Sequence, residues 1–359
     1  MSKKAYLVLE NGKMFEGSFF GAQGDVTGEI VFTTGMTGYL ETLTDPSYYG
    51  QIVLQTFPLI GNYGIIPSDF ESDIIGPIAY ITKNPCQDPS NFRSEGCLDT
   101  FLLERGIIGI CDIDTRAVTK MIRESGVMNG KILSEKPTEA DMEEIKKYSV
   151  VKPIEKVSRK EKELFKGENA KVTVALMDFG AKQNIIRELT KRNCDVWVLP
   201  YDSTPEEILS LSPDGIMLSN GPGNPADNMD IVETIKVLLK KDIPMFGICM
   251  GHQLLAMASG LETAKLKFGH RGPNQAVKDL LGNRCYITSQ NHGYQVLTDN
   301  LDEAIATQWF VNVNDDSNEG LIYNYAPAFS VQFHPEGCGG PQDTGYLFDK
   351  FVDMINEHL

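Results

Sequence analysis

The apolar and polar positions divide the chain into two parts with different periodicity. From residue 171 onward, short apolar runs alternate with segments whose apolar residues recur at helical spacing. Buried strands are predicted at 172–177, 196–199, 215–218 and 243–248, and helices at 181–192, 205–211, 229–239 and 252–258. Strands that alternate with helices form a parallel sheet covered on both faces. A doubly wound, flavodoxin-like α/β domain is therefore predicted for residues 171–359.

The first part of the chain has a different texture. Short β-like runs at 5–9, 29–33, 51–56 and 76–82 alternate with turns that contain many glycines. A β-rich α/β domain is predicted for residues 1–150. Thr138 is predicted to cap a helix, because acidic residues follow it in the first turn. Residues 151–170 are polar, charge-dense and without clear periodicity, so they are predicted to link the two domains.

Length and composition narrow the class of protein. A chain of 359 residues with 42% hydrophobic and 23% charged residues is typical of a globular protein with two domains. A net charge of −16 argues against binding to nucleic acid or to anionic membrane surfaces. The first apolar run is too short for a signal peptide, and no run reaches the ~18 residues of a membrane span.

The spacing of cysteines and histidines indicates the redox compartment and whether a metal-binding motif is present. Seven cysteines, an odd number without paired spacing, do not form a disulfide framework, which favours a reducing, cytoplasmic location. No CxxC, HExxH or EF-hand spacing occurs, so the sequence predicts no metal site.

One segment has the pattern of a nucleophile elbow. Gly247-Ile248-Cys249-Met250-Gly251 lies between a predicted strand and a predicted helix. A sharp turn strains the central residue, and flanking glycines remove Cβ atoms that would clash. The helix N-terminus favours a thiolate. Most free cysteines are only small buried hydrophobes, but this context favours Cys249 as a catalytic nucleophile.

Two further loops carry groups that such a nucleophile needs. His334 ends an apolar run, and Glu336 follows two residues later, so the pair has the ingredients of a base and its orienting carboxylate. Taken alone, a structural histidine at a turn is the alternative. Residues 219–225 are rich in glycine and lack the spacing of a phosphate-binding loop. Their backbone N–H groups could face an oxyanion formed at Cys249.

These three loops, in this order and spacing, resemble the class I glutamine amidotransferases, which use a Cys-His-Glu triad. The resemblance implies that Cys249 attacks the side-chain amide of L-glutamine, that His334 transfers protons and that Glu336 orients the imidazole. Backbone N–H groups of Gly221 and Met250 are implied to form the oxyanion hole. The residues implied to bind glutamine are Ser47, Gly221, Gly223, Met250, Gln253, Asn291, Gly293 and Tyr294.

Other segments resemble one branch of this family, the small subunits of carbamoyl-phosphate synthase. They lie at 34–39, 44–48, 57–64, 112–116, 178–182 and 289–294, so the resemblance covers both domains. It implies a large-subunit partner that receives ammonia and makes carbamoyl phosphate from bicarbonate with ATP and Mg²⁺, whereas this chain binds no cofactor. The N-terminal domain is the implied docking surface. The product is implied to feed arginine or pyrimidine biosynthesis, and the sequence leaves both open.

A few positions depart from the family pattern or have no assigned role. Cys338 lies in a glycine-rich loop near the predicted base, which makes it a weaker candidate for the nucleophile. Tyr294 stands where phenylalanine is expected. The segment around His270 is interpreted as structural. Two alternatives remain: an amidotransferase that serves another acceptor, and a scaffold that only docks and regulates a synthase.

Overall fold

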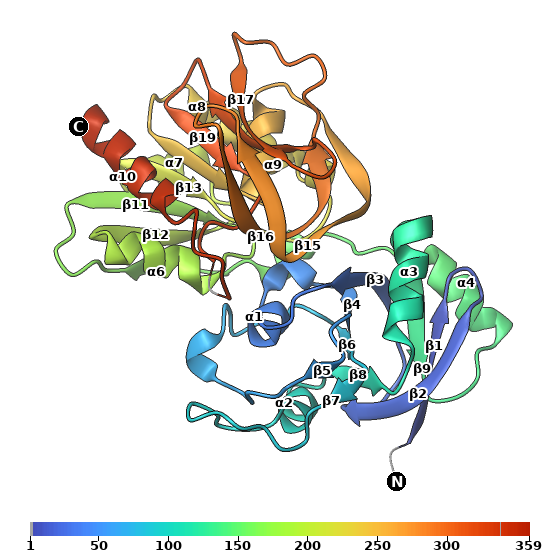
Figure 1. Cartoon of the computed structure of the whole chain (residues 1–359). Coiled ribbons are helices and arrows are strands. Elements are labelled where there is room, and N and C mark those ends of the chain that lie inside the picture. The colour runs from blue at the N-terminus through green and yellow to red at the C-terminus, as the bar shows by residue number, and fades with distance from the viewer. Residues whose placement is uncertain (1–2, 338) are drawn as a thin grey trace. The chain divides into compact units, whose positions relative to one another are not determined.

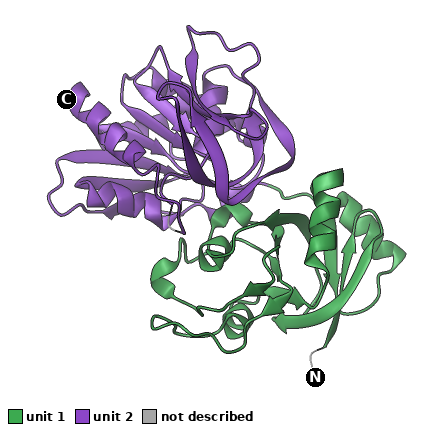
Figure 2. Cartoon of the chain, in the orientation of Figure 1, with its two compact units in different colours: residues 1–151 green, residues 152–359 purple. Residues whose placement is uncertain are grey.

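The computed structural model describes residues 3–337 and 339–359, and it divides into two compact units (Figure 2). Unit 1 comprises residues 1–151 and unit 2 comprises residues 152–359. Cys338, the alternative nucleophile, lies outside the described residues.

Unit 1 is built on a closed seven-stranded barrel (Figure 1). Its strands are β1 (Lys4–Leu9), β2 (Met14–Gly21), β8 (Ile108–Cys111), β6 (Ala79–Ile81), β4 (Gln51–Gln55), β3 (Val26–Thr33) and β9 (Met128–Leu133), in that spatial order. The strands from β8 to β3 pair in parallel and the other pairs are antiparallel. A short parallel pair, β5 (Leu59–Ile60) and β7 (Asn84–Pro85), lies outside the barrel.

Short helices pack around this barrel. They are α1 (Tyr39–Leu43), α2 (Leu98–Glu104), α3 (Thr115–Ser125) and α4 (Glu139–Lys147), with 3-10 turns η1 (Pro46–Tyr48) and η2 (Pro67–Asp69). Leu40 of α1 and Leu102 of α2 share one apolar cluster with Val53 and Tyr80 of the barrel. Thr138 caps α4 as predicted, because its hydroxyl accepts a hydrogen bond from the backbone N–H of Asp141.

Unit 2 contains one ten-stranded sheet, in the order β10-β12-β11-β13-β14-β19-β18-β17-β15-β16. The parallel part consists of β11 (Val172–Asp178), β12 (Cys194–Pro200), β13 (Gly215–Leu218), β14 (Met245–Ile248) and β19 (Ala328–Val331). β18 (Asn318–Tyr323), β17 (Ala306–Asn312), β15 (Thr263–Asp279) and β16 (Arg284–Val296) extend it by antiparallel pairing.

Helices cover both faces of the parallel part. On one face, α6 (Gln183–Lys191) and α10 (Tyr346–His358) pack against Val174 and Leu176 of β11. On the other face, α7 (Pro205–Leu209), α8 (Met229–Leu239) and α9 (Met250–Ala258) pack against Ala175 and Met177. Alternate residues of one strand therefore enter different cores, as a continuous apolar strand requires. The predicted doubly wound α/β fold is confirmed.

Two regions of unit 2 differ from the sequence-based expectation. The segment expected to be a linker contains α5 (Pro153–Val157) and β10 (Glu163–Phe165). β10 pairs with the edge strand β12, and Ile154 of α5 is buried against the sheet, so these residues belong to unit 2. The long β15–β16 pair was also not predicted, because register shifts and buried polar residues interrupt its alternation.

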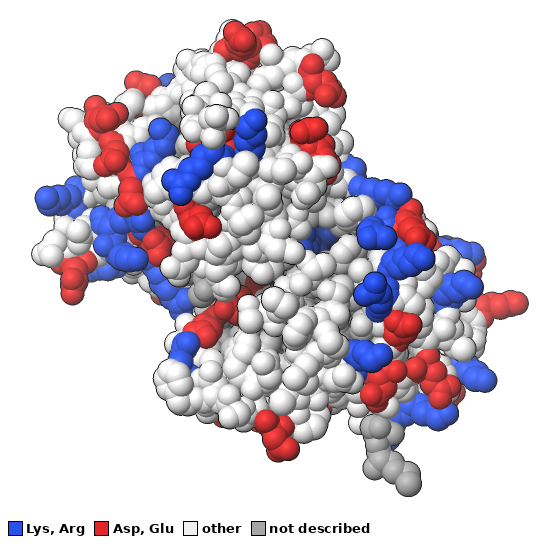
Figure 3. All heavy atoms as spheres, viewed as in Figure 1, with Lys and Arg blue, Asp and Glu red and all other residues white. Residues whose placement is uncertain are grey.

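The distribution of surface charge and the length of the helices are relevant to two classes of partner, nucleic acids and membranes. On the face drawn in Figure 3, basic and acidic side chains are interspersed and separated by uncharged areas. None of the helices in the described part of the chain is long and apolar enough to cross a membrane.

Candidate active site

The turn between β14 and α9 places Cys249 in a strained conformation. Its φ is 52° and its ψ is −101°, a combination that a residue with a Cβ rarely adopts. A Cβ on Gly247 would lie 2.8 Å from the carbonyl oxygen of Gly251. A Cβ on Gly251 would lie 2.3 Å from the carbonyl oxygen of Leu218. Both glycines are therefore required for the helix to start directly after the strand.

The thiol of Cys249 is buried at this turn. Only 2% of the residue is exposed, and its Sγ lies 3.7 Å from the carbonyl oxygen of Asn291. The nine-residue helix α9 starts at the next residue, so the sulfur lies at its N-terminus. The strand end, the helix and the carbonyl oxygen of Asn291 thus fix the position of the sulfur.

His334 and Glu336 form a buried pair just beyond β19. The Nδ1 atom of His334 lies 2.6 Å from Oε1 of Glu336, and the two residues are 1% and 4% exposed. The backbone N–H of His334 donates to the carbonyl oxygen of Ser289, 2.9 Å away, which ties the loop to β16. Because Glu336 occupies Nδ1, the Nε2 atom is the one available to the thiol of Cys249.

Opposing effects set the protonation of this pair. Burial and the ammonium group of Lys182 lower the pKa of His334, but Glu336 and Cys249 outweigh them and raise it to about 10. Burial raises the pKa of Glu336, while the charges of His334 and Lys182 bring it down to about 2. At neutral pH the pair is therefore a carboxylate beside an imidazolium ring, which suits a thiolate as the third member.

Lys182 is a charged neighbour that the sequence did not single out. Its Nζ lies 3.3 Å from Nδ1 of His334 and 3.4 Å from Oε1 of Glu336. It follows β11 and precedes α6, so a third strand end contributes to the cluster. In the sequence, segment 178–182 indicates only a family resemblance, because the contact between Lys182 and His334 joins two distant segments.

The loop at residues 219–225 lies beside the elbow, as expected from the order of the strands. The backbone N–H of Gly251 donates to the carbonyl oxygen of Ser219 at 3.0 Å. A Cβ on Gly221 would lie 2.3 Å from the carbonyl oxygen of Phe179, so glycine is required there. Gly223 has a φ of 96°, which also favours glycine. Met250 is the first residue of α9, where an N–H has no carbonyl partner within the helix.

Several residues predicted to bind glutamine lie on α9 and β16, the two elements that meet at the elbow. The side-chain amide of Gln253 donates to the carbonyl oxygen of Tyr294 at 3.0 Å and to Oε1 of Gln332 at 3.0 Å. Asn291 contributes the carbonyl oxygen next to Cys249. β16 therefore brings Asn291, Gly293 and Tyr294 to the elbow. Ser47 belongs to unit 1, in η1, and its role in binding glutamine stays a prediction.

Family profiles match both units of the chain. The profile described as "Carbamoyl-phosphate synthase small chain, CPSase domain" matches residues 7–132, and the profile described as "Glutamine amidotransferase class-I" matches residues 175–354.

Full-length relatives agree with these profiles. The carbamoyl phosphate synthase small chain of Clostridium perfringens is 51% identical over 350 residues, which cover 97% of this chain and 99% of the relative. The chain belongs to the carbamoyl phosphate synthase small chain family. The homologue from Staphylococcus saprophyticus is 48% identical and covers 100% of this chain and 98% of itself. The one from Oceanobacillus iheyensis is 47% identical, with 98% and 96% covered.

Unit 2 contains other buried histidines besides His334. His334 belongs to the cluster just described. His270 and His292 lie on β15 and β16, and the sequence assigned no chemistry to either. Both are nevertheless buried beside an acidic side chain, Glu319. This second cluster could not be predicted from the sequence, because its members come from three separate strands without motif spacing.

Proposed function

We propose that this chain hydrolyses L-glutamine with Cys249 as the nucleophile and passes the ammonia to a large synthetase subunit. That subunit would use ATP, Mg²⁺ and bicarbonate to make carbamoyl phosphate. The observation that carries the proposal is the buried arrangement of Cys249, His334 and Glu336 at adjacent strand ends, in a chain of the small-chain family. A scaffold without catalysis has no use for a strained cysteine beside a charged histidine–carboxylate pair.

The first half of the reaction forms a covalent intermediate. The sulfur of Cys249 attacks the side-chain carbonyl carbon of glutamine, and the C–N bond breaks as His334 gives its proton to the departing ammonia. Glu336 holds the imidazole through Nδ1, so Nε2 faces the reacting atoms. Backbone N–H groups of Gly221 and Met250 stabilise the negative charge on the carbonyl oxygen. The product is a γ-glutamyl thioester on Cys249.

The second half releases glutamate. Neutral His334 takes a proton from water, whose oxygen attacks the thioester carbon, and the C–S bond breaks to restore the Cys249 thiolate. We assign glutamine binding to Gly223, Gln253, Asn291, Gly293 and Tyr294, together with the two backbone donors. Ser47 is added from the resemblance alone.

The same proposal includes a partner and a compartment. The sequence contains no P-loop spacing, which is consistent with ATP chemistry on another chain. Unit 1, which matches the CPSase-domain profile, is the proposed docking domain. We place the complex in the cytoplasm, where unpaired cysteines remain reduced. Whether the product serves arginine or pyrimidine biosynthesis depends on that partner.

The decisive test measures carbamoyl phosphate formation by the chain with a large subunit, ATP and bicarbonate. Cys249→Ser is expected to lower the glutamine-dependent rate by at least about 10³-fold and to leave the ammonium-dependent rate intact. Cys285→Ser, which changes an exposed cysteine, is the matched control and keeps both rates. Persistence of glutamine use in Cys249→Ser would exclude this cysteine as the nucleophile.

A labelling experiment separates the catalytic interpretation from the scaffold. A glutamine-like chloroketone is expected to alkylate Cys249 selectively, and free glutamine is expected to protect it. Mass spectrometry of tryptic peptides reports which of the seven cysteines reacts. Labelling spread evenly over them would favour a scaffold. Failure of the chain to co-elute with a large subunit at micromolar concentration would contradict the proposed partner.

A further inference from the structure

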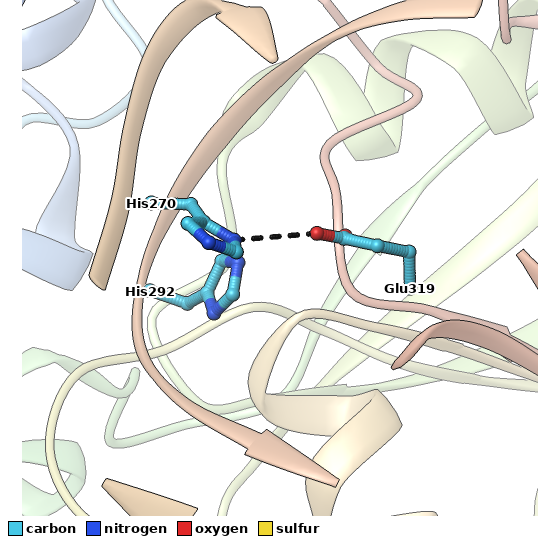
Figure 4. A group of neighbouring side chains, drawn as sticks. All are labelled: His270, His292 and Glu319. Atoms are coloured by element: carbon cyan, nitrogen blue, oxygen red, sulfur yellow. Dashed lines mark ion pairs between the residues drawn. The ribbon is translucent and has the colours of Figure 1, made fainter. Parts of the chain in front are cut away.

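A second cluster of buried side chains lies in the antiparallel part of the unit 2 sheet. His270 of β15 stands opposite His292 of β16, and Glu319 of β18 points toward both (Figure 4). The ring centroids of the two histidines are 4.9 Å apart and their planes are nearly perpendicular, at 89°. The residues are 8%, 5% and 0% exposed. Candidate ligand atoms of the three side chains all lie within 4.8 Å of one another.

Each histidine has its outer nitrogen engaged by an acceptor. Nε2 of His270 lies 2.9 Å from Oδ2 of Asp315, and Nδ1 of His292 lies 2.7 Å from the carbonyl oxygen of Tyr294. Because these oxygens accept hydrogen bonds, they place the ring protons on the outer nitrogens. Nδ1 of His270 then presents a lone pair, with the side-chain nitrogen of Asn312 at 3.4 Å. Nε2 of His292 lies 2.9 Å from Oε1 of Gln290, so with the ring proton on Nδ1 both of these atoms present lone pairs, which a cation would bind. Histidines that bind metals have this arrangement, with the second N–H given to a carboxylate or a carbonyl.

Glu319 provides an observation that is independent of the histidines. Its Oε1 accepts a hydrogen bond from the side-chain amide of Asn312 at 2.9 Å and lies 3.3 Å from Nδ1 of His270. Its Oε2 is buried and has no hydrogen-bond partner among the described residues. Leaving a buried carboxylate oxygen unpaired is costly, and a cation removes that cost. The fully buried Glu319 therefore calls for a positive charge at this point.

We propose that His270, His292 and Glu319 bind a divalent transition-metal ion of the Zn²⁺ class. Two imidazole nitrogens and one carboxylate oxygen form a donor set that suits Zn²⁺ or Co²⁺, whereas Mg²⁺ and Ca²⁺ prefer oxygen donors alone. The side-chain oxygen Oε1 of Gln290, 2.9 Å from Nε2 of His292, offers a donor for a fourth position.

The position of the cluster indicates a structural role for the ion. His292 directly follows Asn291, whose carbonyl oxygen lies next to the sulfur of Cys249. An ion that joins β15, β16 and β18 would fix the part of β16 that carries the glutamine-site candidates. The cluster offers no nucleophile of its own, so the ion acts by holding the strands in place.

A proton is the competing occupant of the same space. If His270 carried a proton on each nitrogen, it would pair with Asp315 and Glu319 without a metal. His292 would then contribute only packing and its hydrogen bonds to Tyr294 and Gln290. Metal content distinguishes the two occupants, because a protonated cluster holds no ion.

The test uses the full chain without an affinity tag, produced in zinc-supplemented medium and dialysed against metal-free buffer. Elemental analysis is expected to find about one zinc per chain. Glu319→Gln is expected to lose it, whereas Glu357→Gln, an exposed control, and Cys249→Ser are expected to keep it. Asp315→Asn, which leaves all three ligands in place, is expected to weaken zinc binding by about 10- to 100-fold in a chelator competition assay.

Cobalt substitution guards against misfolded variants, because it needs only the native sequence. Co²⁺ bound to nitrogen and oxygen ligands is expected to show visible absorption without a sulfur charge-transfer band. Zinc at background level in the wild-type chain, or zinc that disappears in Cys249→Ser, would overturn the proposal. A cobalt spectrum with a sulfur charge-transfer band would do the same.

Discussion

Unit 2 contains two buried clusters in which a histidine contacts a carboxylate, and they differ in what faces the second ring nitrogen. In the first cluster, Nδ1 of His334 meets Glu336 at 2.6 Å and Nε2 is available to the thiol of Cys249. In the second, Nε2 of His270 meets Asp315 at 2.9 Å and Nδ1 faces another carboxylate, Glu319. A thiol can attack a carbonyl carbon, whereas gathered imidazole and carboxylate groups offer electron pairs to a cation.

The two clusters also differ in backbone conformation. Cys249 has a positive φ and is bracketed by glycines, whereas His270, His292 and Glu319 have no positive φ. The positive φ values on β15 belong to the glycines Gly269 and Gly272. A residue with a Cβ is therefore strained at the nucleophile and not among the candidate metal ligands. A histidine–carboxylate pair alone therefore does not identify a catalytic site, but such a pair beside a strained nucleophile does.

The largest expected effect comes from the carboxylate of the first cluster. Glu336→Gln keeps the shape of the side chain but removes the charge that holds the imidazolium. The kcat for glutamine hydrolysis is expected to fall by about 10²- to 10⁴-fold, measured by glutamate release. Glu357→Gln on the exposed end of α10 is the control. Wild-type kcat in Glu336→Gln would mean that the two clusters do not differ as described.

Removal of metal is expected to affect stability through the second cluster only. A zinc ion present at about 100 times its Kd would stabilise the chain by about 2.7 kcal/mol. Dialysis against a chelator is therefore expected to lower the Tm of the wild-type chain in calorimetry and to leave the Tm of Glu319→Gln unchanged. An equal Tm of the wild-type chain before and after dialysis would mean that no bound ion stabilises the second cluster.

The parallel core could be predicted from the sequence because its signals are local. β13 and α8 have the predicted bounds, and α9 starts directly after Cys249. Each strand is a continuous apolar run, and each helix carries a stripe of apolar residues. The antiparallel extension gave no such signal, since β15 and β16 bury His270, Arg271 and Asn291 between register shifts. The closed barrel of unit 1 depends on pairings between distant strands, which periodicity does not reveal.

In the candidate site, too, residues in local motifs could be predicted from the sequence, whereas residues that depend on long-range contacts could not. Cys249, His334 and Glu336 were predicted because each lies in a short motif at a strand end. Lys182 was missed as a member of the cluster, since its contact with His334 joins residues far apart in the sequence. Glu319 was missed for the same reason. Long-range contacts decide what a buried polar residue does, and they become visible only in the folded chain.

The glycines of the elbow allow a smaller test in the first cluster. Gly251→Ala places a Cβ 2.3 Å from the carbonyl oxygen of Leu218, which forces the backbone to move. The free energy of unfolding is expected to fall by about 1–3 kcal/mol, measured by urea denaturation. Gly345→Ala is the matched control, because its φ is −58° and its nearest contact is 3.6 Å away. Equal losses in the two variants would mean that the elbow is not sterically special.

The smallest expected effect is a shift in pH dependence caused by Lys182. His334 must hold a proton when ammonia departs, so kcat/KM for glutamine is expected to fall as the pH rises through about 10, the pKa of that ring. Lys182 lowers this pKa, since its ammonium lies 3.3 Å from Nδ1. Lys182→Met removes the positive charge and keeps the length of the side chain, so the alkaline limb is expected to move upward by about 1 pH unit.

Lys241→Met, an exposed control, is expected to leave the limb in place. Rates measured between about pH 8 and pH 11, with circular dichroism to confirm folding, decide the sign. A limb that stays or moves downward would show that Lys182 does not act on His334 through its charge.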